Sequence, residues 1–507
     1  NIDINLLPTV AMVLSAILIL TVRKLLGVTK WSGPADSIYA LHQQKVGVDV
    51  RVGIGSTLAA FISASGGASV GQYGPLVHFG ATLATVLSRI RGLQISKDVL
   101  LACGVAAAIS AGFNAPIAGI IFAHEALLRR FSIGAVAPIS VASIVASASN
   151  HYFGFANLAF EVPLANLELI EVVPFLIVFA PICSAVAIIY MLALRQGTQF
   201  AASGRYSFTT MIFSTAIVVG IIGAFLPDVL GLGSTQINQM VNGQYALTFL
   251  ILLLVAKILV TAACIAFGFF GGVFGPALFV GAALGGILSG LLIQVGLPSD
   301  YGSIITVATL AAVGSSVIGA PLSVVLIVVE LTGSYDYGLM ALLSVTLCST
   351  LTYRFFGVSY FDRQLLDRGI DLTRGREHIN MTQIRVSELQ MSECLTFPRG
   401  TTSAHVLESM RSNQITEAYI LNGDNTLHGK LDLQSLISSP DDFENSLDLE
   451  PVKLDTSNSL VEALEIATEF VGESIPIMDG EQFKGAITEG DLFKKVLDIE
   501  DSLRAQD

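Results

Sequence analysis

A glycine-proline motif that occurs twice in the chain constrains its fold more than any other feature. Residues 71–81 read GQYGPLVHFGA, and residues 272–282 read GVFGPALFVGA. Both copies keep the first glycine, the Gly-Pro pair and the final Gly-Ala pair at the same spacing. An apolar run follows each Gly-Pro pair, so each copy predicts a helix start with Pro75 or Pro276 at the first helical position.

A second motif repeats in the same order. Pro116 is followed nine residues later by Glu125, and Pro321 is followed at the same interval by Glu330. Hydrophobic segments interrupted by Gly and Pro at corresponding places in two halves indicate a transporter or channel whose site lies between the halves. We expect the two glutamates to cap or pair within the structure, with ion transport as the less favoured alternative.

Two converging helix starts suit a small anion. A helix start presents N–H groups without intrahelical partners and carries a partial positive charge of roughly half an elementary unit. Such a site holds an anion without a lysine or arginine and weakly enough to release it. The alternative is that these helix starts belong to lipid-facing scaffold.

The composition separates a membrane part from a soluble part. The chain is 53% hydrophobic and 13% charged, which is typical of a membrane protein. From Met381 onward there are 24 acidic and 9 basic residues, against 16 acidic and 18 basic before it. The acidity of the C-terminal part favours solubility and argues against nucleic-acid binding. The five cysteines show no paired spacing, which predicts free thiols rather than disulfides or metal ligands.

The patterning predicts three stretches. Residues 1–373 form an all-α polytopic membrane domain with short and broken helices, and residues 99–111, 116–128 and 133–148 are too short for a crossing of about twenty residues. Residues 374–385 form a polar linker. Residues 386–507 alternate in β/α fashion over two units, 386–439 and 449–498, each with the order strand, helix, strand, strand, helix. Since the chain enters an apolar run at once, we expect an N-terminal helix to be missing.

Few other side chains suggest chemistry. Ser32 precedes Gly33 and Pro34 at another helix start, so its hydroxyl is either an anion ligand or an N-cap. His78 and His124 stand alone, and we expect them to be satisfied core or interface histidines. No nucleophile, metal cluster or phosphate loop is recognisable, so we expect neither an enzyme nor a metal site.

These motifs together resemble the CLC family of chloride channels and chloride/proton antiporters. Residues 71–75 are similar to the family's G-[KR]-E-G-P motif, residues 272–276 to G-x-F-x-P, and residues 31–36 to a degenerate G-S-G-I-P-E. The resemblance implies the CLC fold with its inverted repeat, in a homodimer with one pore per subunit. It also implies a multi-pass protein of the plasma (inner) membrane that carries chloride and other small anions and requires no cofactor for that transport.

The resemblance also implies which residues hold the anion. Ser32 matches the family's central chloride-ligand serine. The family's second side-chain ligand is a tyrosine at the start of the last membrane helix. In this chain Phe361 stands at that position, and Tyr360 is one place earlier. The implied anion-binding set is Ser32, Gly33, Gly272, Val273, Phe274, Tyr360 and Phe361.

Two positions depart from the family pattern. Tyr73 stands where the family has its gating glutamate, and Ala126 stands where the family has its inner proton-transfer glutamate. A phenol with a reference pKa near 10 neither mimics an anion nor carries a proton readily at neutral pH. We therefore predict passive chloride conduction uncoupled from protons, with a gate formed by Gly71, Tyr73 and Gly74. The alternatives are an antiporter with an unconventional proton path and, less favoured, a divalent-cation transporter.

The two C-terminal units resemble a tandem pair of CBS domains, which implies a cytoplasmic module that binds adenine nucleotides. Thr488 and Asp491 match the family's G-x-x-T-x-x-D ribose-contacting pattern, whereas the equivalent run from Gly429 to Ser435 does not. One nucleotide site or a purely structural, dimer-forming pair are both compatible with these residues.

Overall fold

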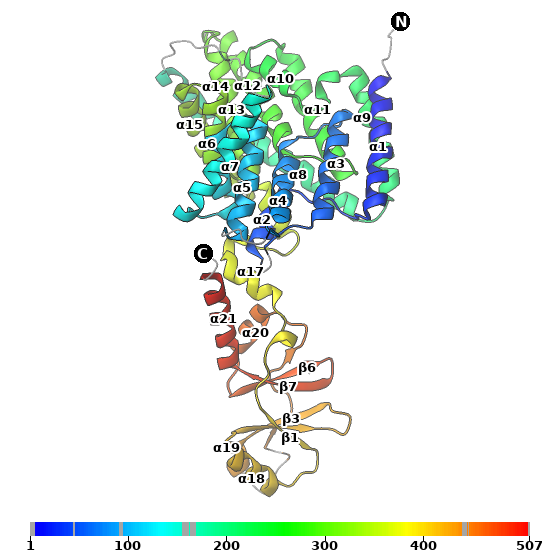
Figure 1. The fold of residues 1–507 in the computed structure, drawn as a ribbon, viewed down its shortest axis with the longest axis vertical. Coiled ribbons are helices and arrows are strands. Elements are labelled where there is room, and N and C mark those ends of the chain that lie inside the picture. The colour runs from blue at the N-terminus through cyan, green and yellow to red at the C-terminus, as the bar shows by residue number, and fades with distance from the viewer. Residues whose placement is uncertain are drawn as a thin grey trace. The chain divides into compact units, whose positions relative to one another are not determined.

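The computed structural model divides the chain into two compact units (Figure 1). The membrane unit comprises Asn1–Leu41 and Lys45–Ile370, and the C-terminal unit comprises His42–Gln44 and Asp371–Asp507. The structure describes residues 6–43, 46–90, 95–154, 162, 169–438, 444 and 446–504.

The described part of the membrane unit is helical, apart from a two-glycine bridge considered below. Its helices are α1 (Leu7–Leu26), α2 (Pro34–His42), α3 (Val50–Ser65), α4 (Tyr73–Leu87), α5 (Lys97–Phe113), α6 (Pro116–Phe122), the π-helix η1 (Ala123–Leu128), α7 (Ile133–Tyr152), α8 (Leu169–Ala202), α9 (Phe208–Phe225), the 3-10 helix η2 (Pro227–Val229), α10 (Ser234–Val241), α11 (Leu247–Ala266), α12 (Phe274–Gln294), α13 (Tyr301–Ile318), α14 (Pro321–Thr332), α15 (Tyr335–Phe356) and α16 (Tyr360–Leu366).

Eight helical segments among the described residues are long and apolar enough to cross a membrane. The segment 133–148, predicted to be too short for a membrane crossing, is the first part of α7. This helix is 20 residues long in total and ends at Tyr152. That prediction was wrong because the helix includes the less apolar run from Ser147 to Tyr152 and tolerates Pro138 in its interior. The helix α6 is short, as predicted, and its equivalent α14 is short as well.

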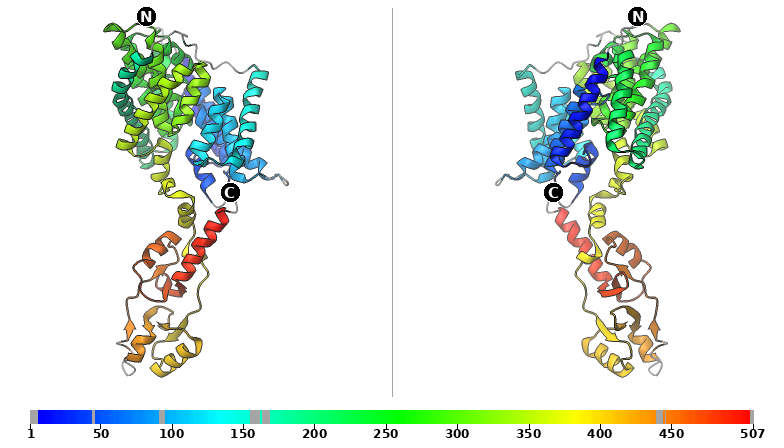
Figure 2. Two further views of the ribbon diagram at one scale, coloured as in Figure 1. Left: turned by 90° about the vertical axis from the view of Figure 1, so that its left-hand side faces the viewer. Right: turned by 90° about the vertical axis from the view of Figure 1, so that its right-hand side faces the viewer.

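The helices of the two halves form two groups. Figure 2 shows α4–α7, in blue and cyan, to one side of the green helices α11–α15. The long helix α1 packs along α9 at the edge of the unit (Figure 1). A Cβ added to Gly220 of α9 would lie only 2.4 Å from the Cα of Thr9, which shows how closely the two backbones approach.

Equivalent glycines bring equivalent helices together in the two halves. A Cβ on Gly80 would lie 2.2 Å from the carbonyl oxygen of Gly104, so α4 and α5 touch through their backbones. A Cβ on Gly281 would lie 2.7 Å from the Cα of Leu310, so α12 and α13 do the same. Gly80 and Gly281 occupy the same place in the repeated motif. This position therefore serves helix packing in both copies.

The prolines of the repeated motif occupy a different position from the predicted one. The helices α4 and α12 begin at Tyr73 and Phe274, so Pro75 and Pro276 are the third helical residues rather than the first. The whole first turn of a helix lacks intrahelical acceptors for its N–H groups, so proline is tolerated throughout it. The starts at Pro34, Pro116 and Pro321 do place proline first.

The C-terminal unit contains two α+β halves in the predicted order. Its elements are η3 (Leu372–Arg374), α17 (Gly375–Gln383), η4 (Val386–Glu388), β1 (Leu395–Pro398), α18 (Ser403–Asn413), β2 (Glu417–Leu421), β3 (Leu427–Asp432), α19 (Leu433–Ser438), β4 (Leu447–Asp448), β5 (Leu454–Asp455), α20 (Leu460–Ala467), β6 (Ser474–Asp479), β7 (Gln482–Thr488) and α21 (Glu489–Arg504). Helix α17 occupies most of the predicted linker. In each half a parallel strand pair is followed by an antiparallel one, giving the sheet orders β1-β2-β3-β4 and β5-β6-β7.

A buried ion pair within the first half of the C-terminal unit also contacts the second half. The ammonium of Lys430 lies 2.7 Å from the carboxylate of Glu417, and both side chains are less than a tenth exposed. Glu417 also accepts hydrogen bonds from the backbone N–H groups of Glu473 and Ser474. Lys430 donates to the carbonyl of Ser474 and covers the ring of Phe470. Because each charge has several partners, the contact keeps the halves in one register.

Candidate anion-conduction site

The two copies of the repeated motif meet at their first glycines. The N–H of Gly71 donates to the carbonyl of Gly272 at 2.7 Å, and the N–H of Gly272 donates back at 2.6 Å. A Cβ on Gly71 would lie 2.9 Å from the carbonyl oxygen of Gly272, and a Cβ on Gly272 would lie 2.7 Å from the nitrogen of Gly74. No other residue type fits this crossing, and it places the starts of α4 and α12 side by side.

Three aromatic rings close the space between these helix starts. The ring of Tyr73 stacks on the ring of Phe113, at the end of α5, with centroids 3.6 Å apart and planes 12° from parallel. The ring of Phe274 meets both edge-on, at 6.0 Å from Tyr73 and 5.5 Å from Phe113. We call Tyr73, Phe113 and Phe274 the aromatic plug. Its ring contacts favour a single closed arrangement.

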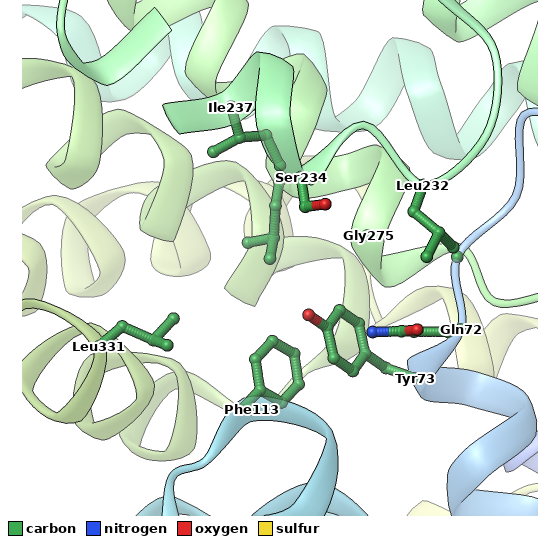
Figure 3. A pocket seen from close by; sticks show the side chains of 10 residues that line it. Gln72, Tyr73, Phe113, Leu232, Ser234, Ile237, Gly275 and Leu331 are labelled. Carbon is green, nitrogen blue, oxygen red and sulfur yellow. The ribbon is translucent and has the colours of Figure 1, made fainter. Parts of the chain in front are cut away.

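A cavity of about 50 Å³, the outer cavity, lies on one side of the plug. Figure 3 shows the rings of Tyr73 and Phe113 side by side at its wall, with the Tyr73 hydroxyl pointing into it. The outer cavity is lined by Gly71, Gln72, Tyr73, Phe113, Leu232, Ser234, Ile237, Gly275, Leu278 and Leu331.

A smaller cavity of about 20 Å³, the inner cavity, also borders the plug, through Tyr73 and Phe274. It is lined by Pro34, Tyr73, Gly74, Val77, Ile109, Phe122, Phe274, Ile318, Ile327 and Phe361. Tyr73 is the residue common to both linings. Tyr73 therefore borders both cavities.

The backbone around Val273 is fixed by a tyrosine that the sequence did not single out. The hydroxyl of Tyr190 on α8 is fully buried and donates to the carbonyl of Val273 at 2.9 Å. Val273 precedes the first residue of α12, so the N–H groups of Val273 and Phe274 belong to the first turn, where no intrahelical acceptor is available. Tyr190 lies in a long apolar helix, and no local motif marks it.

The start of α2 approaches the inner cavity through Pro34 rather than Ser32. The N–H of Ser32 donates to the hydroxyl of Ser56 at 2.9 Å, and the N–H of Gly33 donates to the carboxylate of Asp36 at 2.7 Å. Asp36 is in turn paired with Arg368. The amides of Ser32 and Gly33 are thus occupied by protein groups, and Ser32 does not belong to either cavity lining.

The start of α16 contributes an apolar ring to the inner cavity. Phe361 lines the cavity, whereas Tyr360 does not belong to its lining and is buried. The hydroxyl of Ser359 caps α16 by accepting from the N–H of Asp362. The inner cavity consequently receives no hydroxyl from α16.

The two repeated glutamates cap each other's helices, which confirms the structural role expected for them. Glu330 accepts from the N–H groups of Ile117 and Ala118 at 2.9 and 2.8 Å, at the start of α6. Glu125 accepts from the N–H groups of Leu322 and Ser323 at the same distances, at the start of α14. The sequence showed two equivalent glutamates but not that each caps the other half's helix.

Ala126 and the two histidines occupy structural surroundings. Ala126 is buried in η1, directly after Glu125. His78 shares a hydrogen bond of 2.7 Å between its Nδ1 and the hydroxyl of Ser37. His124 lies 3.1 Å from the carbonyl of Arg130 through its Nδ1 and stacks on Phe131. All three belong to the interior of the membrane unit. The expectation of satisfied histidines holds for Nδ1 only, because the Nε2 atoms of His78 and His124 are buried without a hydrogen-bond partner among the described residues.

In the C-terminal unit, the predicted nucleotide residues contact each other. The carboxylate of Asp491 accepts from the N–H and the hydroxyl of Thr488, at 3.2 and 2.6 Å, and from the hydroxyl of Ser392. Burial alone would raise the pKa of Asp491, but the hydrogen bonds from Ser392 and Thr488 outweigh it and hold the pKa below its usual range. The first half has a similar pair in the reverse order along the chain. There the carboxylate comes first, and Asp432 accepts from the N–H and hydroxyl of Ser435.

Comparison with known proteins assigns this arrangement to a family. Residues 13–353 match the family described as "Voltage gated chloride channel". A ClcB-like chloride channel protein of Ralstonia nicotianae is 28% identical over 326 residues, covering 62% of this chain and 76% of its own. The chloride channel protein CLC-f of Arabidopsis thaliana is 29% identical over 327 residues, covering 58% of this chain and 41% of its own. The H(+)/Cl(-) exchange transporter ClcA of Vibrio vulnificus is 24% identical over 315 residues, covering 60% of this chain and 67% of its own.

Solved structures show the same fold at low sequence identity. A slow cyanobacterial Cl-/H+ antiporter matches with a TM-score of 0.63 and 18% identity, covering 72% of this chain and 86% of its own. A eukaryotic CLC transporter matches with a TM-score of 0.62 and 16% identity, covering 95% of this chain and 89% of its own. The matched family spans most of the membrane unit, including both copies of the repeated motif. This multi-pass membrane protein therefore belongs to the voltage-gated chloride channel family.

Proposed function

We propose that the protein conducts chloride passively, without coupling to protons, and that Tyr73 is its gate. The observation that carries the proposal is the position of the Tyr73 ring, which borders both cavities and stacks on Phe113. A carboxylate at this position would compete with chloride and carry a proton when it leaves. A phenol with a reference pKa near 10 blocks by its bulk and donates a hydrogen bond instead.

The inner side supports the same proposal. Glu125 is engaged with the start of α14, and the next residue is Ala126, which carries no proton. The names of several relatives describe H+/Cl- exchange, so a coupled antiporter with another proton path is the second candidate. We further propose that the protein is not an enzyme and requires no cofactor for conduction.

Reversal potentials under crossed gradients test the proposal. The protein is reconstituted in liposomes with opposed chloride and pH gradients, and protein-free liposomes serve as the control. We expect the reversal potential to follow the chloride gradient alone. A potential displaced by the pH gradient, with proton efflux in fixed ratio to chloride uptake, would establish exchange and reject passive conduction. Replacing the cations on both sides checks that the permeant ion is the anion.

We also propose a homodimer in the plasma (inner) membrane that pairs through α6 and α14. Ile117 and Leu322, the second residues of these equivalent short helices, are exposed by 55% and 50%. Apolar side chains at such places suit a contact between two copies of the unit. Light scattering in detergent should give the mass of a dimer, and the double variant Ile117→Trp/Leu322→Trp should give a monomer. A monomer in the unaltered protein would contradict the pairing.

For the C-terminal unit we propose a cytoplasmic CBS pair that binds an adenine nucleotide at Thr488 and Asp491. The carboxylate of Asp491 accepts hydrogen bonds from the hydroxyls of Thr488 and Ser392, and a ribose hydroxyl would replace the hydroxyl of Ser392. Calorimetry of the intact protein with ATP, ADP and AMP should give heat that Asp491→Asn abolishes and Asp432→Asn, the matched change in the first half, leaves in place. Absence of heat with all three nucleotides would reject nucleotide binding, and a CBS pair with a purely structural role would remain.

A further inference from the structure

An apolar groove lies between the helices α4, α5 and α7 of the membrane unit. Helix α5 packs against both of its neighbours (Figure 1). The groove has a volume of about 520 Å³, and its lining consists of apolar side chains, glycines and the thiol of Cys103. It is far larger than the two cavities at the aromatic plug and shares no lining residue with either of them. The groove is therefore a separate feature of the membrane unit.

The groove exists because one face of α5 carries small residues that no neighbouring helix covers. Gly104, Ala107 and Ala111 lie along this face, and each is only half-buried. Alanines of α7 form the opposite wall. The equivalent helix of the second half, α13, offers no such face, because it is buried at every residue except Gly302. The two halves therefore differ here, although their backbones follow the same plan.

The length of the groove matches one leaflet of a bilayer. The lining residues extend from Leu76 to Leu87 along α4 and from Leu100 to Ala111 along α5. On either helix, eleven steps of 1.5 Å give about 16 Å. The hydrocarbon core of a membrane is about 30 Å thick, so the acyl chains of one leaflet fill about 15 Å. One extended acyl chain therefore fits the groove from end to end.

Two cations lie at one end of the groove, where α4 ends and α5 begins. Arg89 follows the lining residue Leu87 by two residues, and Lys97 precedes the lining residue Leu100 by three. Both side chains are exposed, and neither forms an ion pair within the part of the chain that the structure describes. Basic residues at the ends of membrane helices lie at the level of the lipid head groups.

The start of α5 adds to this positive end. The neighbouring acid, Asp98, is balanced by its ion pair with Arg130. Ser96 precedes the helix, and its side chain makes no capping hydrogen bond to the first turn. The first N–H groups of this 17-residue helix can therefore donate to phosphate oxygens, next to the two cations.

From this arrangement we propose that the groove binds an anionic phospholipid, with one acyl chain between α4, α5 and α7 and the phosphate at Arg89 and Lys97. The apolar lining, the length of one leaflet and the positive charge at one end all match that ligand. The helices proposed to pair two copies, α6 and α14, contribute no residue to the lining. The lipid site is independent of chloride conduction, and neither proposal depends on the other.

Native mass spectrometry of the intact protein in detergent tests the head-group end of the site. The protein is supplied with phosphatidylglycerol or phosphatidylcholine of identical acyl chains, and we expect it to retain phosphatidylglycerol preferentially. Arg89→Gln/Lys97→Gln should lower this preference about fivefold for each cation removed. Lys24→Gln/Arg205→Gln removes two other exposed cations, is the matched control and should keep the preference. Equal retention of both lipids by the unaltered protein would overturn the proposal, as would a preference that survives in Arg89→Gln/Lys97→Gln.

A variant with a filled groove tests the acyl-chain end. Ala107→Phe places a ring in the groove and should lower the retention of phosphatidylglycerol at least tenfold. Val218→Phe adds a ring to the exposed face of α9, is the matched control and should leave retention unchanged. Unchanged retention in Ala107→Phe would place the lipid elsewhere and overturn the proposal. A loss of dimer mass in Ala107→Phe, measured by light scattering, would assign the groove to a second copy and overturn it as well. If Ala107→Phe does not fold, the exposed changes at Arg89 and Lys97 still decide the proposal.

Discussion

The two halves of the membrane unit meet at two pairs of helix starts, and the two meetings differ in chemistry. At the starts of α6 and α14, each set of free N–H groups is filled by a carboxylate from the other half, Glu330 and Glu125. At the starts of α4 and α12, the halves meet through glycine backbone, and the first side chains are the rings of Tyr73 and Phe274.

The two pairs of helix starts therefore differ in the anion that each can bind: a carboxylate of the chain itself at α6 and α14, and an anion from solution at α4 and α12. A carboxylate on the chain satisfies a helix start at all times, so the first pair binds the two halves together. Where no carboxylate is supplied, the amides stay available to an anion from solution, and in the proposed function an aromatic ring controls access to them. The same backbone chemistry therefore serves assembly at one pair and, in the proposed function, conduction at the other.

We call the starts of α6 and α14 the filled pair and the starts of α4 and α12 the open pair. The largest effect is expected when a carboxylate is removed from the filled pair. Glu125→Ala deletes acceptors for the N–H groups of Leu322 and Ser323 and for the Ser323 hydroxyl. We expect a loss of about 3 kcal/mol or more in the free energy of unfolding, since each hydrogen bond to a charged group contributes about 1.5–3 kcal/mol. Thermal unfolding in detergent measures it, with the exposed Asp300→Ala as control. An unaltered unfolding temperature would show that the caps do not hold the halves.

At the open pair, the starts of α4 and α12, removal of the Tyr73 ring should increase chloride conduction. Tyr73→Ala loses ring contacts with Phe113 and Phe274 that contribute about 1–3 kcal/mol together, which corresponds to roughly a ten- to hundredfold rise in chloride flux if they hold the gate closed. Tyr206→Ala, a change of an exposed tyrosine, is the control. Flux that stays the same or falls in Tyr73→Ala would mean that the ring is not the barrier.

The open pair can also be given the chemistry of the filled pair. In Tyr73→Glu, a carboxylate with a reference pKa near 4.3, raised by burial, would compete with chloride for the helix starts. Flux at neutral pH should then be lower than in Tyr73→Gln and should rise as the pH falls through the pKa of the carboxyl group. Equal fluxes in the two variants across this pH range would show that the helix starts at this crossing do not select for anions.

The smallest effect is expected at a filled helix start in the C-terminal unit. Ser459 and Glu462 form a capping box at α20, and the N–H and hydroxyl of Ser459 hold the pKa of Glu462 below its usual range. Because the folded pKa is depressed, this stabilisation is present above about pH 4.3 and is lost as the pH falls through the folded pKa. Hydrogen exchange of α20 should accelerate on acidification in the unaltered protein, and less so in Glu462→Gln. Identical pH profiles in the unaltered protein and in Glu462→Gln would show that the Glu462 carboxylate does not stabilise the start of α20.

The sequence alone determined the repeat, the family resemblance, the broken helices and the order of the C-terminal elements. These follow from local rules, because glycine and proline mark helix starts and alternating apolar residues mark strands. The same rules predicted a helix start at Pro75, two residues after the observed start of α4 at Tyr73, and identified Glu125 and Glu330 as equivalent.

Only the tertiary structure decided which groups meet. It joined Gly71 to Gly272, gave each glutamate to the other half's helix and set Tyr190 on the carbonyl of Val273. It also showed the amides of Ser32 and Gly33 bonded to protein groups. Such contacts join residues that are mostly distant in the chain, and they depend on how the helices cross, which no local pattern of residues encodes.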